Sequence, residues 1–294
     1  MGIVTHSGRF HADEVFACAA LSILYEGKVE IVRSREPKVW ETGDYVVDVG
    51  GVYDPETKRF DHHQEGGAGA RVNGVPYSSF GLVWKHYGEK LAGSIEAAET
   101  IDKRLVQPID AGDNGMDSFL PIEGMAPYLI QDIVMVFAPS WNETRTDDDG
   151  FFEVLEIAIK ILDRTIRRTQ DIVLGQHFVE EAYAQAPDKR IIILEGSYPW
   201  HEVLASHAEP LYVITPDRGV KGDWKVEAIR DDSRTFKNRK SFPLSWAGKQ
   251  GEELAEISGV SDAFFCHNNR FITAAHSKEG AIALATMAAN ALLV

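Results

Sequence analysis

Cysteine is scarce in this 294-residue chain, and its two copies, Cys18 and Cys266, stand far apart and form no CxxC pair. They cannot build a disulfide framework or a zinc–thiolate cluster. Basic charge is also scarce, since 30 Lys and Arg face 45 Asp and Glu, a net charge of −15. Such a surface repels phosphate and disfavours broad adhesion to nucleic acid or anionic membranes. A small anionic substrate is allowed only where local cations or metal ions reverse the field.

Long apolar runs are missing as well. No stretch approaches the roughly 20 apolar residues that a membrane span needs, and the opening MGIVTHSGRFHADE meets charge too early for a signal peptide. The remaining composition, 44% hydrophobic and 26% charged, is typical of a globular protein with one large or two moderate domains. We expect a soluble, cytoplasmic protein with no membrane partner.

Short apolar runs alternate with helical patterns in the first part of the chain. Strands are predicted at 2–5, 29–32 and 45–49, and helices at 12–25, 78–91, 95–108 and 126–137. Short buried strands separated by helices are typical of a parallel sheet with both faces covered. A polar, acidic loop is expected at 141–150.

A long helical pattern follows over 152–184, broken near Gly175 and ended by Pro187. Beyond it the pattern predicts strands at 190–194, 211–215, 224–229, 263–266 and 271–274, and an alanine-rich helix over 278–293. We therefore predict a mixed α/β protein in which a long connector helix joins two domains. The first covers 1–186 and the smaller second one covers 187–294.

Histidines and acids gather directly after the predicted strands of the first domain. His6, His11 and Asp13 follow the first strand, where an open parallel sheet binds its ligands, although Asp13 could simply cap the next helix. Asp48 ends an apolar strand whose Tyr, Gly and Val neighbours offer it no obvious partner. A buried acid of this kind is costly, so Asp48 is expected to bind a cation or to cap the following turn.

The sequence Asp61-His62-His63 is the sharpest of these groups. One imidazole can bind a metal while the other faces substrate, and the acid can orient a ring by accepting its hydrogen bond. Farther on, Asp110 and Asp113 occur in DAGDNG, a predicted turn after a helix. Turn aspartates are common without any further role.

Together these groups form an ordered set, H-x4-H-x-D, D, DHH and D-N-G, on consecutive elements of one α/β domain. That order resembles the DHH phosphoesterase superfamily, which includes RecJ-type exonucleases, oligoribonucleases and manganese pyrophosphatases. Longer stretches across the chain look like the MYG-type family, among them THSGRFHADEVFA, VDVGGVYDPETKRFDHHQ, SYPWHEVL and RKSFPLSWAG. Eukaryotic members of that family act as 3′–5′ RNA exonucleases, and the family is also labelled metal-dependent protein hydrolase.

The resemblance implies an N-terminal DHH-type domain with a two-metal site and a smaller C-terminal domain that closes over substrate. It also assigns roles: His6 and His11 match ligands of the first metal, Asp13, His62 and Asp113 those of the second, Asp48 the bridging carboxylate, and His63 the histidine facing the scissile phosphate. His11 stands where most superfamily members have Asp, which makes the site softer and one charge less negative. Asp110 is the weaker alternative to Asp113, because DNG aligns with the superfamily's D-T-G.

Mixed imidazole and carboxylate ligands suit Mn²⁺ or a similar first-row ion, whereas Mg²⁺ prefers oxygen. We therefore expect two divalent ions, with Mn²⁺ favoured and Mg²⁺ or another first-row metal as alternatives. Two metals about 3.5–4 Å apart lower the pKa of a shared water and stabilise the attacking and leaving oxygens. His63 could then stabilise the developing charge or protonate the leaving group.

The second domain is less explicit, because the superfamily's GGGH substrate motif is absent. His267, between two predicted strands, is nearest in position, and a hairpin-turn role is equally open for it. A basic cluster interleaved with aromatic residues comprises Arg230, Arg234, Lys237, Arg239 and Lys240 with Phe236, Phe242 and Trp246. Cations with aromatics suit a short single strand, so Arg239 and Lys240 are predicted to bind substrate. An exposed basic loop is the alternative.

The leading hypothesis is a metal-dependent phosphoesterase, a 3′–5′ exonuclease on short single-stranded RNA or DNA. A phosphatase acting on small compounds such as pyrophosphate or phosphoadenosine phosphate is the alternative within enzymes. Only the family label suggests peptide hydrolysis, since no HExxH, nucleophile elbow or Cys–His arrangement occurs. A non-catalytic, metal-stabilised regulatory module is the last alternative. His63 argues against it, because a closed structural site has no use for a second imidazole at its rim.

Overall fold

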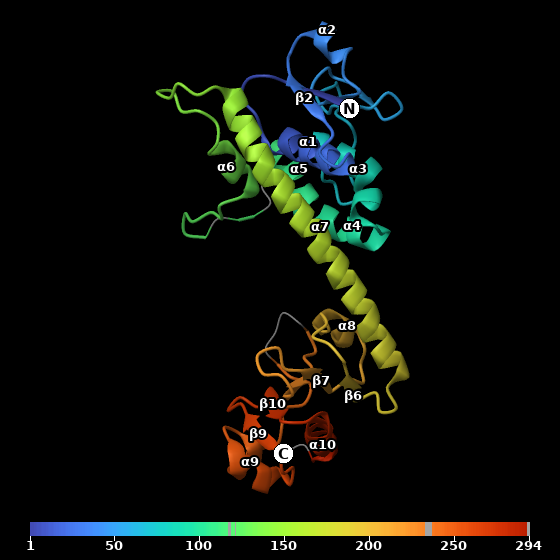
Figure 1. Ribbon diagram of the computed structural model, residues 1–294, viewed down its shortest axis with the longest axis vertical. Helices are drawn as coiled ribbons and strands as arrows, with labels where there is room; N and C mark the ends of the chain where they lie inside the picture. Colours follow the sequence, from blue (N-terminus) through green and yellow to red (C-terminus); the bar gives the residue numbers. More distant parts are fainter. Residues whose placement is uncertain (117–118, 121, 233–236, 293–294) are drawn as a thin grey trace. The chain divides into compact units, whose positions relative to one another are not determined.

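The computed structural model describes residues 1–116, 119–120, 122–232 and 237–292, and it divides into two compact units, Met1–Asp171 and Ile172–Val294 (Figure 1). The dividing line falls within the long helix α7, Asp147–Gln185, which joins the two units. The boundary that the sequence predicts, at 186, lies instead just after this helix. The predicted mixed α/β class with a helical connector is confirmed.

The first unit is built on a five-stranded sheet in the order β2-β1-β3-β5-β4. Its strands are β1 (Gly2–Thr5), β2 (Glu30–Arg33), β3 (Tyr45–Val47), β4 (Tyr53–Asp54) and β5 (Arg59–Phe60). All neighbours pair in parallel except β4, which joins β5 antiparallel. The carboxyl ends of β1, β3 and β5 therefore meet at one edge of the sheet, where open α/β sheets bind ligands.

The helices of this unit besides α7 are α1 (Ala12–Leu24), α2 (Pro37–Trp40), α3 (Ser79–Ala92), α4 (Ile95–Ile101), α5 (Gln107–Asp113) and α6 (Ile130–Met135). Helix α1 is apolar over most of its surface, as the sequence ADEVFACAALSIL predicts, and is buried along most of its length. It packs against α3, with the rings of Phe16 and Phe80 5.5 Å apart. The packing of α1 against α3 holds the N-termini of both helices in position beside the carboxyl ends of the strands.

The predicted turn around Asp110 and Asp113 is wrong, because the helix that begins at Ile95 continues to Asp113. A π-helical turn, Asp102–Val106, lies between α4 and α5. It shifts the hydrogen-bond register so that Pro108 falls in the first turn of α5, where its missing N–H costs nothing. Both aspartates are thus held on a helix rather than on a loop.

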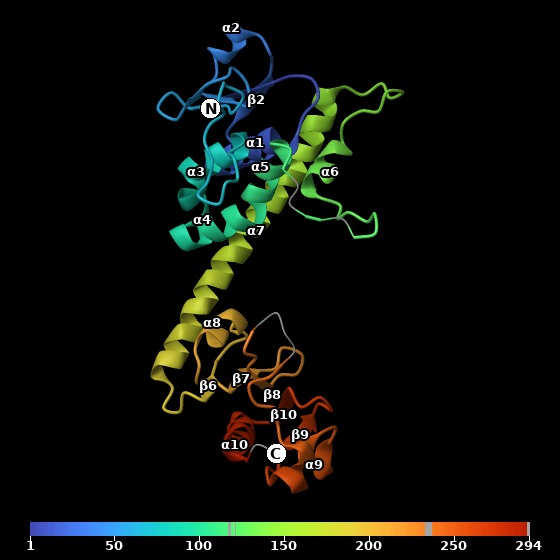
Figure 2. The same cartoon turned by 180° about the vertical axis from the view of Figure 1, so that it is seen from behind.

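The second unit contains a five-stranded sheet in the order β6-β7-β8-β10-β9. The strands are β6 (Ile191–Ile193), β7 (Tyr212–Pro216), β8 (Trp224–Ala228), β9 (Ala263–Cys266) and β10 (Ile272–Ala275). Only β6 and β7 pair in parallel. The remaining elements are α8 (His201–Ser206), a 3₁₀ turn at Leu244–Trp246, α9 (Gly251–Ser258) and α10 (Lys278–Asn290). Helix α10 contacts β7, β8 and β10 and lies beside them in both views (Figures 1 and 2).

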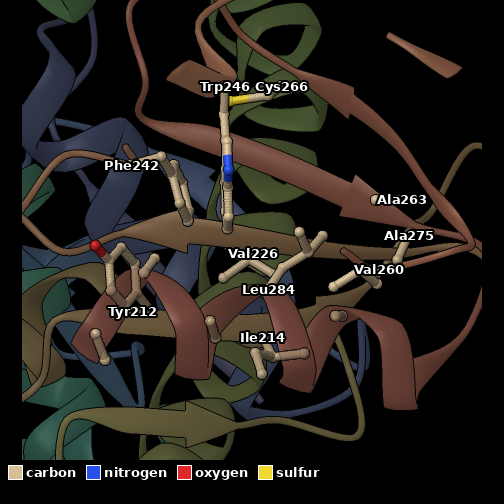
Figure 3. Close-up of a cluster of buried hydrophobic side chains, with 14 of the residues drawn as sticks. Tyr212, Ile214, Val226, Phe242, Trp246, Val260, Ala263, Cys266, Ala275 and Leu284 are labelled. Atoms are coloured by element: carbon tan, nitrogen blue, oxygen red, sulfur yellow. The ribbon is translucent and has the colours of Figure 1, made fainter. Parts of the chain in front are cut away.

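Three aromatic rings lie within the largely aliphatic core of the second unit (Figure 3). The ring of Phe242 stacks on Tyr212, with centroids 4.9 Å apart, and lies 6.2 Å from Trp246. Leu284 from α10 completes the contact with the sheet. Phe242 and Trp246 are thereby committed to the interior, and their rings are not available to stack on a ligand.

Helix α7 begins earlier than the sequence predicts and has no break near Gly175, so both of these expectations are wrong. Three aspartates, Asp147, Asp148 and Asp149, form its first turn, where negative charge suits the helix dipole. Gly175 is required by packing, since a Cβ there would lie 2.5 Å from Cδ of Pro199. In the described part of the chain no helix, α7 included, combines the length and apolarity needed to cross a membrane.

Candidate metal centre

Three neighbouring parallel strands end in the side chains that the sequence singles out. His6 follows β1, Asp48 follows β3, and His62 and His63 follow β5. Because β1, β3 and β5 pair side by side, a single edge of the sheet gathers all four residues. These segments stand far apart in the sequence, so only the parallel topology makes them one group.

Helix termini complete the group. Asp13 lies in the first turn of α1, Asp113 is the last residue of α5, and His11 is the N-cap residue of α1. The ring of His11 is 6.2 Å from that of His6, measured between centroids. The structure thus brings together every first-domain residue that the resemblance names as a ligand.

Asp48 lies at the centre of this cluster and is almost completely buried. Its Oδ2 is 3.3 Å from Nε2 of His6, and its Oδ1 is 3.4 Å from Nε2 of His62 and 3.5 Å from Nδ1 of His63. The backbone of Asp48 is left-handed, with φ +58°, a costly conformation that is concentrated at functional sites. Its two oxygens thereby face imidazoles on both sides, as a bridging carboxylate requires.

His62 occupies the other half of the cluster. Its Nε2 is 3.1 Å from Oδ2 of Asp113 and 3.8 Å from Oδ2 of Asp13. Oδ1 of Asp13 is also buried, and it has no hydrogen-bond partner among the described residues. An unpaired buried carboxylate oxygen is costly, and a cation bound to it would remove that cost.

Overlapping sets of three side chains can place ligand atoms within 4.8 Å of one another. These sets are His6-His11-Glu14, Asp48-His62-His63, His11-Asp13-Asp113 and Asp13-Glu14-Asp48. Imidazole and carboxylate donors in such a mixture suit first-row divalent ions. The residues present therefore fit the two metals that the resemblance implies.

Glu14 belongs to this cluster although the sequence analysis did not select it. It is fully buried, and its Oε1 lies 3.0 Å from Nε2 of His6. Its carboxylate also accepts the backbone N–H of His11 at 2.8 Å, the ordinary capping contact of a Glu at the third helical position. In the sequence, Glu14 is explained by capping alone, so its contact with His6 is not evident. Only the position of Glu14 beside Asp13 in the same helical turn could have indicated a place in the cluster.

The electrostatics of the cluster are those of protonated imidazoles held between carboxylates. Burial alone would lower the pKa of His6, but its contacts with Asp48 and Glu14 raise it to about 10, and contacts with Asp113 and Asp48 likewise raise that of His62 to about 10. Burial and the neighbouring acids raise the pKa of Asp13. Burial would also raise the pKa of Asp48, but hydrogen bonds from His6 and His62 lower it. A divalent ion entering this cluster would replace the imidazole protons.

The start of α3 positions two of these acids. Ser79 donates its backbone N–H to Oδ2 of Asp13 at 3.3 Å and its hydroxyl to Oδ1 of Asp48 at 2.8 Å. Such supporting hydrogen bonds fix the orientation of a metal ligand. Ser79 carries no sequence signal, because its contacts depend on segments 31 and 66 residues away.

Asp110 also holds the N-terminus of α3 in place. It is fully buried and accepts hydrogen bonds from the hydroxyl of Ser78 at 2.5 Å, from the N–H of Gly81 at 3.0 Å and from Nη1 of Arg71 at 2.7 Å. A Cβ on Gly81 would lie 1.9 Å from Oδ2 of Asp110, so α3 can lie this close to Asp110 only with glycine at position 81. Asp110 is thus occupied by structural contacts, whereas Asp113 faces His62.

His63 stands at the rim, with 61% of its side chain exposed. Its Nδ1 lies 2.8 Å from Oδ1 of Asp61, and this hydrogen bond raises the pKa of His63. Two cavities, of about 480 and 500 Å³, meet at His63 and His11. The ring is therefore oriented by an acid and open to a ligand in either cavity.

The candidate substrate residues of the second unit are differently placed. Arg239 donates Nη1 to the carbonyl oxygens of His207 at 2.5 Å and Pro210 at 3.0 Å, and Nη2 to that of Ala205 at 2.8 Å. Lys240 donates Nζ to two carbonyl oxygens at the end of α10, that of Ala289 at 2.8 Å and that of Ala291 at 2.7 Å. These contacts argue against the substrate-binding role that the sequence suggests for both residues.

The rest of the basic cluster gives little further support. Arg234 and Phe236 lie outside the described residues. His267 is half-buried in the turn between β9 and β10, where its Nδ1 accepts the N–H of Asn269 at 3.0 Å. This is the hairpin-turn role weighed above, and a contact of His267 with substrate stays a prediction.

Comparison with known proteins extends over both units. The model of the uncharacterised protein family UPF0160, named MYG1_exonuc, matches residues 2–289. The MYG1 exonuclease of Mus musculus is 32% identical over 320 residues, 96% of this chain and 83% of the relative. A MYG1 protein of Dictyostelium discoideum is 33% identical over 318 residues, 98% of this chain and 96% of the relative. One from Chlamydia pneumoniae is 32% identical over 283 residues, covering 94% and 92%.

Proposed function

The chain belongs to the MYG1 exonuclease family (UPF0160), and from that premise we propose that it is a two-metal phosphodiesterase, a 3′–5′ exonuclease on short single-stranded RNA or DNA. Relatives from Mus musculus and Homo sapiens carry the name exonuclease. The observation that carries the proposal is Asp48, whose two carboxylate oxygens face imidazoles from two different strands. A carboxylate in that position can bridge two ions, and paired ions serve phosphodiester hydrolysis.

The ligand assignment combines the roles that the resemblance implies with the distances in the cluster. We assign one ion to His6, His11, Glu14 and Asp48, and the other to Asp13, His62, Asp113 and the same Asp48. Mn²⁺ suits these mixed donors, with Mg²⁺ or another first-row ion as alternatives. When bound, such a pair lowers the pKa of an attacking water and stabilises negative charge on the phosphoryl oxygens.

His63 is proposed to act on the substrate. Asp61 holds its ring through Nδ1, and this hydrogen bond raises the pKa of His63, which favours the protonated ring. A protonated imidazole at the rim can stabilise charge on the phosphate or donate a proton to the leaving oxygen.

The charge of the protein favours short substrates. With a net charge of −15, the surface repels a long polyanion. The bound ions then attract only the few substrate phosphates that reach the two cavities beside them. We expect affinity for oligonucleotides to fall only gently with salt, because few counterions are released.

The proposal is tested by incubating the full chain, with Mn²⁺ or Mg²⁺, with 5′-labelled RNA and DNA pentamers, pyrophosphate and phosphoadenosine phosphate. Stepwise shortening from the 3′ end is the expected result. His63→Ala should abolish most of it, whereas His86→Ala, which changes an exposed histidine outside the cluster, should leave it intact. If only the small phosphates are hydrolysed, the protein is not an exonuclease. If no substrate is hydrolysed in the presence of metal, the protein is not a metal-dependent hydrolase.

A further inference from the structure

Two residues beside the metal ligands take no part in the chemistry described so far. Arg35 follows β2, the strand next to β1, and Trp40 is the last residue of the short helix α2. Both line the 480 Å³ cavity to which His6, Asp48 and His63 also contribute. Among the described lysines and arginines, Arg35 alone lines either cavity at the cluster. An anionic substrate entering here would meet a single guanidinium group.

The guanidinium of Arg35 is held in place by two contacts, and several of its N–H donors are left for a ligand. Nε donates to the carbonyl oxygen of Ser7 at 3.0 Å, and Nη2 lies 3.1 Å from Nδ1 of His6. A guanidinium has five N–H donors, so at least three remain after these contacts. Within the described part of the chain, no carboxylate forms an ion pair with Arg35, in a protein rich in acids. An oriented arginine of this kind suits a phosphate, which it can bind with two parallel hydrogen bonds.

Trp40 gives the same cavity an aromatic wall. Its indole Nε1 donates to the carbonyl oxygen of Ser34 at 3.0 Å, and the ring packs beside the valine cluster at the end of the sheet. Gly50 lies against it, since a Cβ there would be 3.5 Å from Cε3 of the ring. Gly50 and Gly51 both have positive φ and add no side chain to the cavity. A fixed indole beside a cation is what a nucleobase and its phosphate need.

We propose that this cavity is a subsite for one nucleotide of the substrate, in which Arg35 binds a phosphate oxygen and Trp40 stacks on the base. The inference rests on the proposed function, because it takes the reacting phosphate to lie over Asp48 and His63. A volume of about 480 Å³ is within the usual range for small-molecule sites. A pocket for a single nucleotide beside the reacting phosphate favours removal of nucleotides one at a time.

Two probes that share a phosphate separate the roles of the two residues. Calorimetry on the full-length, Mn²⁺-loaded protein measures the affinity for adenosine 5′-monophosphate and for ribose 5-phosphate, which lacks the base. Arg35→Ala should weaken binding of both probes about 10- to 100-fold, and Arg35→Lys less. Trp40→Leu should weaken only the nucleotide, about 10-fold, and Trp40→Phe should restore most of that affinity.

The chain offers matched controls for both substitutions. Arg167→Ala changes an exposed arginine on α7, and Trp141→Ala removes a tryptophan that is 97% exposed. Neither variant should change the affinity for either probe. Thermal melting of each variant shows whether Trp40→Leu remains folded, and the Phe variant keeps the test decisive because it preserves the packing.

The outcomes distinguish the subsite from the proposed function. The subsite is overturned if the parent protein does not bind adenosine 5′-monophosphate, if Arg35→Ala binds both probes normally, or if Trp40→Leu weakens both equally. Hydrolysis of bis(4-nitrophenyl) phosphate by the parent tests the phosphodiesterase separately. If that hydrolysis is absent while the nucleotide still depends on Arg35 and Trp40, the proposed function fails and the subsite stands.

Discussion

The two units of this protein use charged side chains in opposite ways. In the first, Asp13 and Asp48 face imidazoles and other acids, and Oδ1 of Asp13 has no hydrogen-bond partner among the described residues. In the second, Arg239 and Lys240 give their donors to backbone carbonyl oxygens. The first arrangement leaves a buried carboxylate oxygen for a ligand, whereas the second is complete within the fold. The partner of a charged group therefore indicates its role better than local charge density does.

The comparison predicts its largest effect at Asp48. Asp48→Ala removes the carboxylate shared by both ion sites, so both ions and essentially all turnover should be lost. The fold should survive, because the substitution also removes a buried negative charge and relieves like-charge crowding around Asp13. Metal analysis together with circular dichroism checks this. Two ions retained per chain in the variant would show that Asp48 does not bridge them.

The two adjacent histidines should separate binding from chemistry. His62→Ala removes a ligand and should lower the metal content. His63→Ala should keep both ions and lower turnover by about 10²- to 10⁴-fold, the usual contribution of a positioned acid or base. Metal content and rate are measured on the same preparations. Equal metal loss in both variants would mean that these roles are misassigned.

Arg239 should behave as a structural residue of the second unit. Arg239→Ala leaves the carbonyl oxygens of Ala205, His207 and Pro210 without their donor and should lower the free energy of unfolding by roughly 2–4 kcal/mol. Turnover per folded molecule should change less than twofold, and the exposed Arg167→Ala should change neither quantity. A raised KM for oligonucleotides with unchanged stability would restore the substrate-binding interpretation.

The smallest effect concerns pH. Without metal, His6 and His62 have a folded-state pKa of about 10, against an ordinary value of 6.5. Their stabilising contribution is therefore complete below about pH 6.5 and is lost as the pH rises toward 10. With metal bound the trend should reverse, because alkaline pH favours deprotonated ligands. Melting temperatures measured with EDTA and with Mn²⁺ should diverge above pH 6.5, and parallel curves would contradict the assignment of these imidazoles.

Much of the first unit was predictable because its signals are local. Strands β1 and β3 are continuous apolar runs, and the polar residues that form the cluster follow them directly. Strand β5 was missed because two residues, Arg59 and Phe60, carry no periodicity, although the DHH sequence after it was evident. Parallel pairing of the strands brings the separate motifs together into one site, and the sequence pattern also indicates this pairing.

What could not be predicted depends on contacts between distant segments. Nothing near Arg239 in the sequence shows that carbonyl oxygens in the last turn of α8 and directly after it surround its guanidinium. The structural role of Asp110 is equally hidden, since its donors Arg71 and Ser78 are 39 and 32 residues away. Local patterns supply residue types and element positions, and tertiary packing decides which charged groups remain for a ligand.

We propose that the acid and histidine cluster of the first unit binds two ions, while the charges of the second unit serve its fold. Anomalous diffraction from crystals grown with Mn²⁺ distinguishes the two directly. We expect two peaks about 3.5–4 Å apart, on either side of the Asp48 carboxylate, with no ordered ion at Arg239 or Lys240. A single peak, or two peaks that do not share Asp48, would contradict it.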